Sequence, residues 1–264
     1  EALSAGKHVF VEKPLALNVD ELREVKAAAD AARDRLIMVG FNRRFSPHAV
    51  KLKQLLAGRS EPLCLNMTVN AGIIPPDVWV HDPVRGGGRI IGEGCHFIDL
   101  MVFLTDSEVE SVAAQMVGPG FAVREDKMSI ALRFADGSVG TVNYFSNGAK
   151  SYPKEMLEVF SDGRVLRLEN FRWTVGYGVK GFSKFKTSRL DKGHNAEFAA
   201  FVDRVRQGGA PLIPLRELFN VTLASIAAVT AAREGRQIDI DGEYGAALAP
   251  SESPTSTPVG AGAS

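Results

Sequence analysis

The sequence is poor in cysteine, with only Cys64 and Cys95 among its 264 residues. Two cysteines form neither a disulfide framework nor the spacing of a metal site, so we expect no bound metal. The sequence also lacks an excess of one charge, because 31 Lys and Arg residues balance 31 Asp and Glu residues. This balance gives no electrostatic footprint for a nucleic-acid partner or an acidic membrane surface.

Long apolar runs and a secretory signal are missing as well. No run approaches the ~20 apolar residues of a membrane span, and the first residues do not follow the pattern of a signal peptide. We therefore expect a soluble, cytoplasmic protein. Apolar residues make up 45% of the chain, enough for a substantial core. Residues 1–6 are typical of the last turn of a helix with Gly6 as its C-cap, so we expect the chain to begin inside an element.

The most informative stretch runs from Arg85 to Leu104, where three consecutive glycines precede an apolar helical pattern. We expect this helix to begin near Gly92 or Glu93, which places His96 in its first turn. The positive end of a helix favours a neutral imidazole, and a neutral imidazole can accept a proton. On this stretch alone, a buried helix with a hydrogen-bonded histidine is the favoured interpretation.

A second stretch, residues 6–17, predicts a ligand site. Val9 to Val11 is typical of a buried parallel strand, and Pro14 ends it. Lys13 therefore lies at the carboxyl end of a strand, where open α/β sheets bind ligands. Asn18 is a candidate N-cap of the following helix, and residues 36–41 form a second strand, so Asn42 and the arginine after it lie at the same edge.

Taken as a set, the motifs of this chain resemble the glucose–fructose oxidoreductase/inositol dehydrogenase (Gfo/Idh/MocA) family. Four segments in the order and at the spacing of the family carry the resemblance, which covers roughly residues 1–240: Ala-Gly-Lys-His-Val-Phe-Val-Glu-Lys-Pro at 5–14, Val-Gly-Phe-Asn-Arg-Arg-Phe at 39–45, the glycine stretch with His96-x-x-Asp99, and Asp-Lys-Gly-His-Asn-Ala-Glu at 191–197.

The resemblance implies an NAD(P)-dependent oxidoreductase that acts on a secondary alcohol of a sugar, a cyclitol or a similar molecule. His96 matches the acid/base histidine of the family, and Lys13 matches the lysine that hydrogen-bonds the reacting oxygen. Further implied residues fall into a cofactor-binding and a substrate-binding group: Glu12, Lys13, Pro14 and Arg43 for the cofactor, and Asn42, Asp82 and His194 for the substrate. For Asp82, a turn aspartate before a proline is an equally good interpretation.

One departure from the family concerns a carboxylate near the histidine. Many members carry an aspartate four residues before it, and this chain has Gly92 there. Glu93 is one residue later, about 100° around the helix. Either Glu93 takes over the carboxylate role or that carboxylate is absent. Asp99 is the other candidate carboxylate and is expected to pack behind the site or orient its neighbours.

The second departure concerns the dinucleotide. In the family, a G-x-G-x-x-G turn well upstream of the Glu-Lys-Pro motif holds the phosphates, and nothing in this chain can be that segment. Residues 176–181 match the pattern, but no helical stripe follows, so we interpret them as a mobile loop rather than a phosphate site. The implied cofactor is therefore NAD or NADP, with its main phosphate-binding segment absent, and we expect no productive dinucleotide binding by this chain.

The predicted fold is α/β followed by α+β. Residues 1–45 are the expected remainder of a Rossmann parallel sheet, and residues 46–240 an expected substrate and oligomerisation domain. Hairpin signals at 136–137 and 162–163 predict that this domain is a large, mainly antiparallel open sheet with helices on one face. Helix 214–234 is a candidate for packing back on the Rossmann part, residues 243–264 are expected to be disordered, and region 126–170 is expected to form a homo-oligomer.

Three functions remain open at this point. The first is the C-terminal part of an NAD(P)-dependent oxidoreductase, which Lys13 and His96 together favour. The second is a non-catalytic relative that binds a sugar or a protein, to which Gly92 gives some weight. The third is a redox-assisted glycosidase, as some members of the family are.

Overall fold

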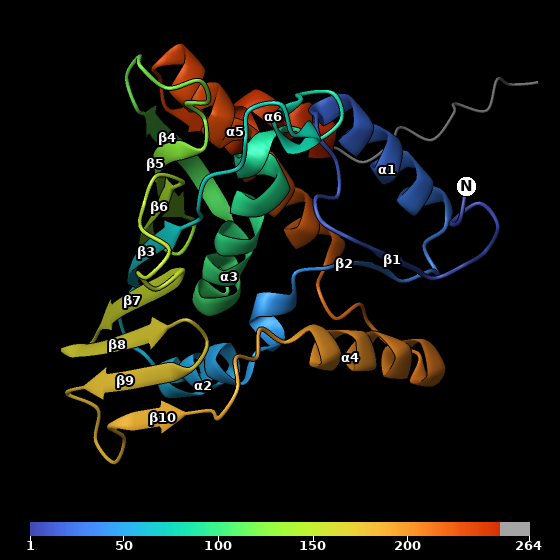
Figure 1. The fold of residues 1–264 in the computed structure, drawn as a ribbon. Helices are drawn as coiled ribbons and strands as arrows, with labels where there is room; N and C mark the ends of the chain where they lie inside the picture. The colour runs from blue at the N-terminus through green and yellow to red at the C-terminus, as the bar shows by residue number, and fades with distance from the viewer. Residues whose placement is uncertain (249–264) are drawn as a thin grey trace, which may run out of the picture.

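The chain forms two sheets of unequal size (Figure 1). The computed structural model describes the backbone of residues 1–248 and the side chains of residues 1–245. Strands β1 (Val9–Val11) and β2 (Ile37–Val39) pair in parallel, and α1 (Val19–Ala31) connects them. This remnant of a Rossmann sheet is the strand–helix–strand unit that the sequence predicted.

Side-chain caps fix the start of two helices. Asn18 accepts a hydrogen bond from the backbone N–H of Glu21 at 2.9 Å, as predicted for the N-cap of α1. The Glu21 carboxylate accepts from the N–H of Leu17 at 2.7 Å, which closes the chain entering the helix. After β2, a 3₁₀ turn, η1 (Asn42–Phe45), leads into α2 (Pro47–Leu56), and Ser46 caps α2 by accepting from Ala49 at 3.0 Å.

The second sheet has nine strands and is mainly antiparallel. Their order across the sheet is β10-β9-β8-β7-β3-β6-β5-β4-β11, and only β3 and β6 pair in parallel. The strands are β3 (Cys64–Asn70), β4 (Val109–Met116), β5 (Lys127–Phe134), β6 (Val139–Phe145), β7 (Glu155–Ser161), β8 (Arg164–Glu169), β9 (Trp173–Tyr177), β10 (Lys184–Lys186) and β11 (Ile238–Asp239).

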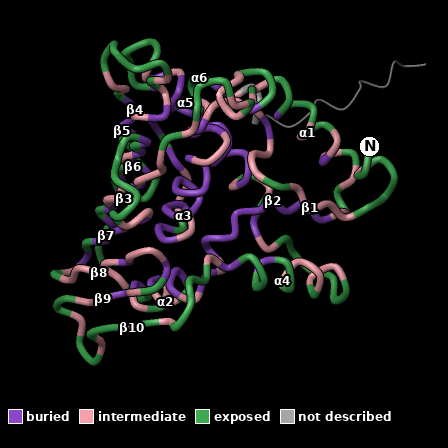
Figure 2. Tube along the Cα trace, viewed as in Figure 1, coloured by how far each residue is buried: buried purple, intermediate pink, exposed green. Residues whose placement is uncertain are grey.

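Helices cover one face of this sheet, as predicted. A 3₁₀ turn, η2 (Trp79–His81), and a π-helix, η3 (Ile90–Gly94), precede α3 (Cys95–Thr105), and α4 (His194–Gln207), α5 (Leu215–Glu234) and α6 (Ile240–Leu248) follow the strands. Alternate residues of β5 point into this layer and are buried, from Met128 to Phe134. Figure 2 shows that α3 and much of α5 are buried, so the core lies between them and the sheet.

Helix α5 is the one described helix long and apolar enough to cross a membrane by length and composition. The sequence predicted a helix over residues 214–234 but no membrane span, because polar residues interrupt its apolar stretch. In the fold, 67% of the apolar window is buried inside the protein, and α5 contacts α3, β4 and also α1. It is therefore a core helix. It packs against α3 and β4 of the large-sheet part and against α1 of the Rossmann part.

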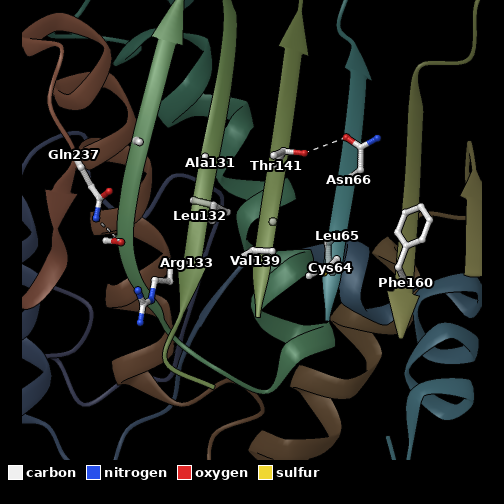
Figure 3. A pocket seen from close by; sticks show the side chains of 13 residues that line it. Cys64, Leu65, Asn66, Ala131, Leu132, Arg133, Val139, Thr141, Phe160 and Gln237 are labelled. Atoms are coloured by element: carbon white, nitrogen blue, oxygen red, sulfur yellow. Dashed lines mark hydrogen bonds between the residues drawn. The ribbon is translucent and has the colours of Figure 1, made fainter. Parts of the chain in front are cut away.

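The opposite face of the large sheet is open to solvent. Residues paired across four strands form a row of small side chains on this face: Ala113, Ala131, Thr141 and Asn66. Figure 3 shows this row, with Thr141 donating to Asn66 at 3.0 Å, over a shallow hollow of about 360 Å³. Larger apolar side chains, Val139 and Phe160, lie exposed at its rim.

Three predictions about local structure were wrong. The helix that carries His96 starts earlier than expected, because the π-helix η3 runs directly into α3 and the N–H of Cys95 bonds the carbonyl of Ile90. Residues 176 and 177 belong to β9 rather than to a loop, whereas 178–181 lie in the loop that connects β9 to β10. Residues 243–248 are helical, in α6; the rest of the predicted disordered tail, 249–264, lies outside the described residues.

The link between α5 and the sheet generates a prediction. The Asn220 side chain accepts from the N–H of Val109 at 2.8 Å and donates to its carbonyl at 2.9 Å, at the start of β4. Asn220→Ala leaves both buried groups unpaired, so we expect a loss of roughly 1–3 kcal/mol in unfolding free energy, measured by urea denaturation. Thr222→Val is the matched control, because Thr222 bonds only Leu218 in its own helix. Equal stability of the two variants would show that Asn220 does not lock α5 to β4.

Candidate active site

Most of the predicted site residues gather around a cavity of about 330 Å³. Its walls come from the segments after β1 and β2, from the loop between β3 and η3, from the η3–α3 helix and from the segment before α4. The side chains of greatest chemical interest among its lining residues are Lys13, Asn42, Arg43, Trp79, Arg85, Arg89, Glu93, His96, Lys192 and His194.

Lys13 enters the cavity from the end of β1, where a cis peptide bond joins it to Pro14. Its ammonium donates a hydrogen bond to the carbonyl of Gly92 at 2.6 Å. This contact joins the parallel sheet to the π-helix, which are 79 residues apart in the chain. Lys13 thus bonds the backbone carbonyl of Gly92, the residue at which many members of the family carry an aspartate.

The segment after β2 holds the other wall. The Arg43 guanidinium donates twice to Glu155 of β7, both at 2.9 Å, and lies over the ring of Phe97. Lys192 donates to the same carboxylate at 2.5 Å, and Asn42 donates to the backbone carbonyl of Lys192 at 2.8 Å. Although burial alone would raise the pKa of Glu155, Arg43 and Lys192 lower it, so it is ionised between its two cations.

A glycine allows the segment before α4 to approach η1. Gly193 has a φ of 92°, and a Cβ there would lie 2.3 Å from the carbonyl oxygen of Asn42. Only glycine fits this contact. The close approach brings Lys192 and His194, on either side of Gly193, to the rim of the cavity.

His96 lies in the cavity wall and is only 6% exposed. Its Nδ1 has no hydrogen-bond partner among the described residues, and its ring packs edge-on against Phe41. Burial and the charges of Arg43 and Lys13, with Lys192 and His194, hold the pKa of His96 well below its ordinary value. The imidazole is therefore neutral, as predicted, but the reason differs: η3 precedes it, so His96 does not lie in the first helical turn.

Glu93 also lines the cavity, but its carboxylate is fully engaged. It accepts from Tyr144 at 2.5 Å, from Arg89 at 2.8 Å and from Lys154 at 3.0 Å. Although burial alone would raise the pKa of Glu93, Lys154 and these hydrogen bonds lower it to about 2. Such a carboxylate anchors the cavity wall and is a poor proton acceptor.

Three predicted site residues lie outside the cavity lining. Asp99 is fully buried and binds Arg44 with both oxygens, at 3.1 and 2.5 Å, so it packs behind the site. Asp82 accepts from the N–H groups of Val84 and Arg85, which supports its interpretation as a turn aspartate. Glu12 is exposed and faces Gly40.

Sequence reasoning missed several lining residues. Lys192 falls within a segment that was singled out, but only its neighbour His194 was assigned a role. Glu155, which lies behind the cavity wall, was missed as well, because no local signal shows that it meets Arg43, 112 residues earlier. Arg85 and Arg89 flank the glycines that were singled out, so their proximity to His96 in the chain was the available signal.

The strand ends fit one part of a nicotinamide cofactor. Lys13, Pro14 and Arg43 line the cavity where β1 and β2 end, and the partnerless Nδ1 of His96 leaves a buried polar atom in its wall. The phosphates find no equivalent support at residues 176–181, because a strand and not a helix follows these glycines. The described residues thus fit the reactive end of the cofactor and not its pyrophosphate.

Behind the site, a second carboxylate is held in an unusual state. Glu197 in the first turn of α4 is 3% exposed, and its Oε1 has no hydrogen-bond partner among the described residues. Burial and the carboxylates of Glu12 and Asp99 raise the pKa of Glu197 to about 8, although Arg44 opposes the shift.

This shift predicts a pH-dependent stability. In the unfolded chain Glu197 loses its proton near its ordinary pKa of 4.5, whereas the folded protein keeps it up to about pH 8. Its contribution to stability is therefore complete below pH 4.5 and is lost as the pH rises through 8, by about 1.4 kcal/mol per pKa unit. Urea unfolding should find Glu197→Gln close to the wild type at pH 5 and more stable at pH 9. Glu24→Gln, on exposed α1, is the control; parallel pH profiles for all three proteins would contradict the shift.

Comparison with known proteins adds to this geometry. Residues 1–41 match the oxidoreductase family with an NAD-binding Rossmann fold, and residues 61–166 match the GFO/IDH/MocA C-terminal domain. The chain is 32% identical to the uncharacterized oxidoreductase YrbE of Bacillus subtilis over 66% of this chain and 52% of that protein. It is 28% identical to a myo-inositol 2-dehydrogenase of Thermotoga maritima over 90% of this chain and 74% of that enzyme.

Solved structures agree on the fold. The oxidoreductase domain protein from Kribbella flavida superposes with a TM-score of 0.77 at 21% identity, over 90% of this chain and 75% of that one. The chain spans only about half the length of the Bacillus relative, and its match to the Rossmann fold ends at residue 41. With both domains matched in the same order, the chain belongs to the Gfo/Idh/MocA family of oxidoreductases, with its Rossmann domain present only in part.

Proposed function

We propose that this chain supplies the substrate site of an NAD(P)-dependent oxidoreductase that acts on a secondary alcohol or ketone of a sugar, a cyclitol or a similar molecule. The main support is that Lys13 and His96, which come from the two different parts of the fold, line one cavity. Membership in the family and the similarity to a myo-inositol 2-dehydrogenase support the class of substrate.

Two parts of the chain have different roles, cofactor binding and substrate binding. Residues 1–45 help to bind the cofactor through Lys13, Pro14 and Arg43, with Glu12 outside the cavity. Residues 46–240 form the substrate part, where His194 and the exposed ring of Trp79 lie at the cavity. The cofactor is NAD or NADP, and the cytoplasmic location expected from the sequence stays a prediction.

In the proposed mechanism, two side chains act on the reacting oxygen. Neutral His96 accepts the hydroxyl proton during oxidation and returns it during reduction. Lys13 donates a hydrogen bond to the same oxygen, in place of its present bond to the Gly92 carbonyl. The nicotinamide, when bound, accepts or supplies the hydride. Glu93 holds Arg89 and Tyr144 in the wall and takes no proton in this scheme.

A non-catalytic binding protein and a redox-assisted glycosidase remain the alternatives. Gly92 gave the first of these some weight, because a carboxylate is missing there. The Lys13–Gly92 hydrogen bond weakens that argument, since the backbone carbonyl oxygen of Gly92 serves as the hydrogen-bond partner of Lys13 without a side-chain carboxylate.

His96→Ala tests the catalytic assignment. In the protein expressed from its complete gene, we expect turnover of a polyol substrate, followed by NADH or NADPH absorbance, to fall by roughly 10²-fold or more. The loss follows from removing the group that accepts the proton. His81→Ala is the control, because His81 lies in the β3–η3 loop that forms another wall of the cavity but does not line the cavity itself. Near-wild-type turnover of the His96 variant would remove it as the acid/base.

We also propose that the open face of the large sheet joins two copies of the chain. Its central row of Ala113, Ala131, Thr141 and Asn66 has only small side chains, which leave room for another sheet to approach, and Val139 and Phe160 are 48% and 44% exposed. Apolar side chains exposed together in this way are typical of interaction surfaces.

Ala131→Arg should dissociate the oligomer, because a long charged side chain then stands at the centre of the row. Multi-angle light scattering should give at least the mass of a dimer for the wild type and that of a monomer for the variant. Ala31→Arg at the exposed end of α1 is the matched control and should keep the wild-type mass. A monomeric wild type at high concentration would contradict the proposed interface.

A further inference from the structure

The charge of the cavity is strongly one-sided. Its lining contains one carboxylate, that of Glu93, and a second, Glu155, lies directly behind. Five cationic side chains line the same cavity: Lys13, Arg43, Arg85, Arg89 and Lys192. The site is therefore positive even after both carboxylates are taken into account, although the whole chain is neutral.

Two of these cations have no carboxylate partner. Arg43 and Lys192 share Glu155, and Arg89 binds Glu93 at 2.8 Å. The ammonium of Lys13 has only the carbonyl of Gly92. The guanidinium of Arg85 makes no hydrogen bond or ion pair in the part of the chain that the structure describes, and Arg85 is exposed at the cavity.

Arg85 is held at the cavity by its backbone. Asp82 accepts from its N–H at 3.2 Å, and the next residue, Gly86, bonds the carbonyl of Asp82 at 2.8 Å. A Cβ at Gly86 would lie 2.5 Å from the carbonyl oxygen of Trp79, so only glycine allows this tight turn. The turn belongs to the large-sheet part of the chain, in the loop between β3 and η3.

The excess positive charge of the cavity acts directly on His96. Arg43 of η1, Lys13 after β1 and Lys192 before α4 each contribute a positive charge that disfavours a charged His96. The carboxylates nearest to it on its own helix are committed, Glu93 to three donors and Asp99 to Arg44. An imidazole that accepts a proton here adds another positive charge to a positive cavity, which lowers its strength as a base.

We infer that the substrate is an acidic sugar or cyclitol, whose carboxylate or phosphate binds Arg85 and offsets the positive charge around His96. The inference rests on the proposed function and narrows its substrate class. Arginine suits this role because its planar guanidinium binds either acidic group with two hydrogen bonds. The volume of about 330 Å³ is enough for one sugar ring with such a group.

Matched pairs of ligands test the inference by calorimetric titration of the 264-residue chain. D-Glucuronate and D-glucose 6-phosphate are compared with neutral D-glucose. At least one acidic probe should bind about tenfold or more tightly than glucose, the effect of one charge-assisted hydrogen bond, and added salt should reduce the difference. Preference for one acidic probe over the other identifies the acidic group.

Arg85→Gln should abolish most of that preference, and Arg23→Gln, on exposed α1, should keep it. Gly92→Asp is the second variant: a carboxylate beside Lys13 should weaken the acidic probe and not glucose. A Cβ at Gly92 meets only the carbonyl oxygen of Gly86, at 3.3 Å, so the substitution requires a small shift. Thermal unfolding shows whether each variant is folded.

The outcomes separate this inference from the proposed function. Equal binding of acidic and neutral probes overturns the acidic substrate, and a preference that survives Arg85→Gln overturns Arg85 as the residue that binds the acidic group. If the protein from the complete gene oxidises neutral polyols faster than acidic sugars, the acidic substrate is overturned, while the proposed oxidoreductase function still holds. Tight, Arg85-dependent binding of an acidic probe without any nicotinamide reduction supports the acidic ligand and contradicts the oxidoreductase.

Discussion

The buried guanidinium of Arg44 holds the two parts of this protein together. It follows β2, yet it binds Asp99 of α3 with two hydrogen bonds and Glu217 of α5 at 2.6 Å, and it lies over the ring of Phe103. A charge with 7% exposure is stable only when its donors are matched in this way. Removing one partner would leave an uncompensated buried charge, so the small parallel sheet and the helical layer of the large sheet are fixed as one unit.

The adjacent Arg43 performs the corresponding task for the cavity. While Arg44 points to the helices, Arg43 binds Glu155 of the large sheet, and Lys192 completes that cluster. Consecutive residues of one 3₁₀ turn therefore fix both the framework and the site. The same arrangement explains the electrostatics: the carboxylates near the cavity neutralise structural cations, and none is left to balance Lys13 around His96.

Local signals predicted much of the fold. The N-cap Asn18 and the hairpin signals at 136–137 and 162–163 marked the start of α1 and two of the hairpins, because these features act within a few residues. The motifs also brought Lys13 and His96 to one cavity. The Arg43–Glu155 pair and the contacts of Glu93 with Tyr144 and Lys154 were beyond prediction, since they join residues from distant segments. The sequence left open whether Asp82 binds substrate or stabilises a turn, and its hydrogen bonds to the N–H groups of Val84 and Arg85 support the turn.

The parallel pairing of β3 with β6 affects how the chain can fold. β3 (Cys64–Asn70) lies in the middle of the large sheet, between β6 and β7, and both of these neighbours come much later in the chain. During synthesis, β3 leaves the ribosome long before either partner exists, with Leu65, Met67 and Val69 uncovered. Closing such long loops costs entropy before any pairing energy is gained, so we expect the hairpins β4–β5–β6 and β7–β8–β9 to form before β3 inserts between them.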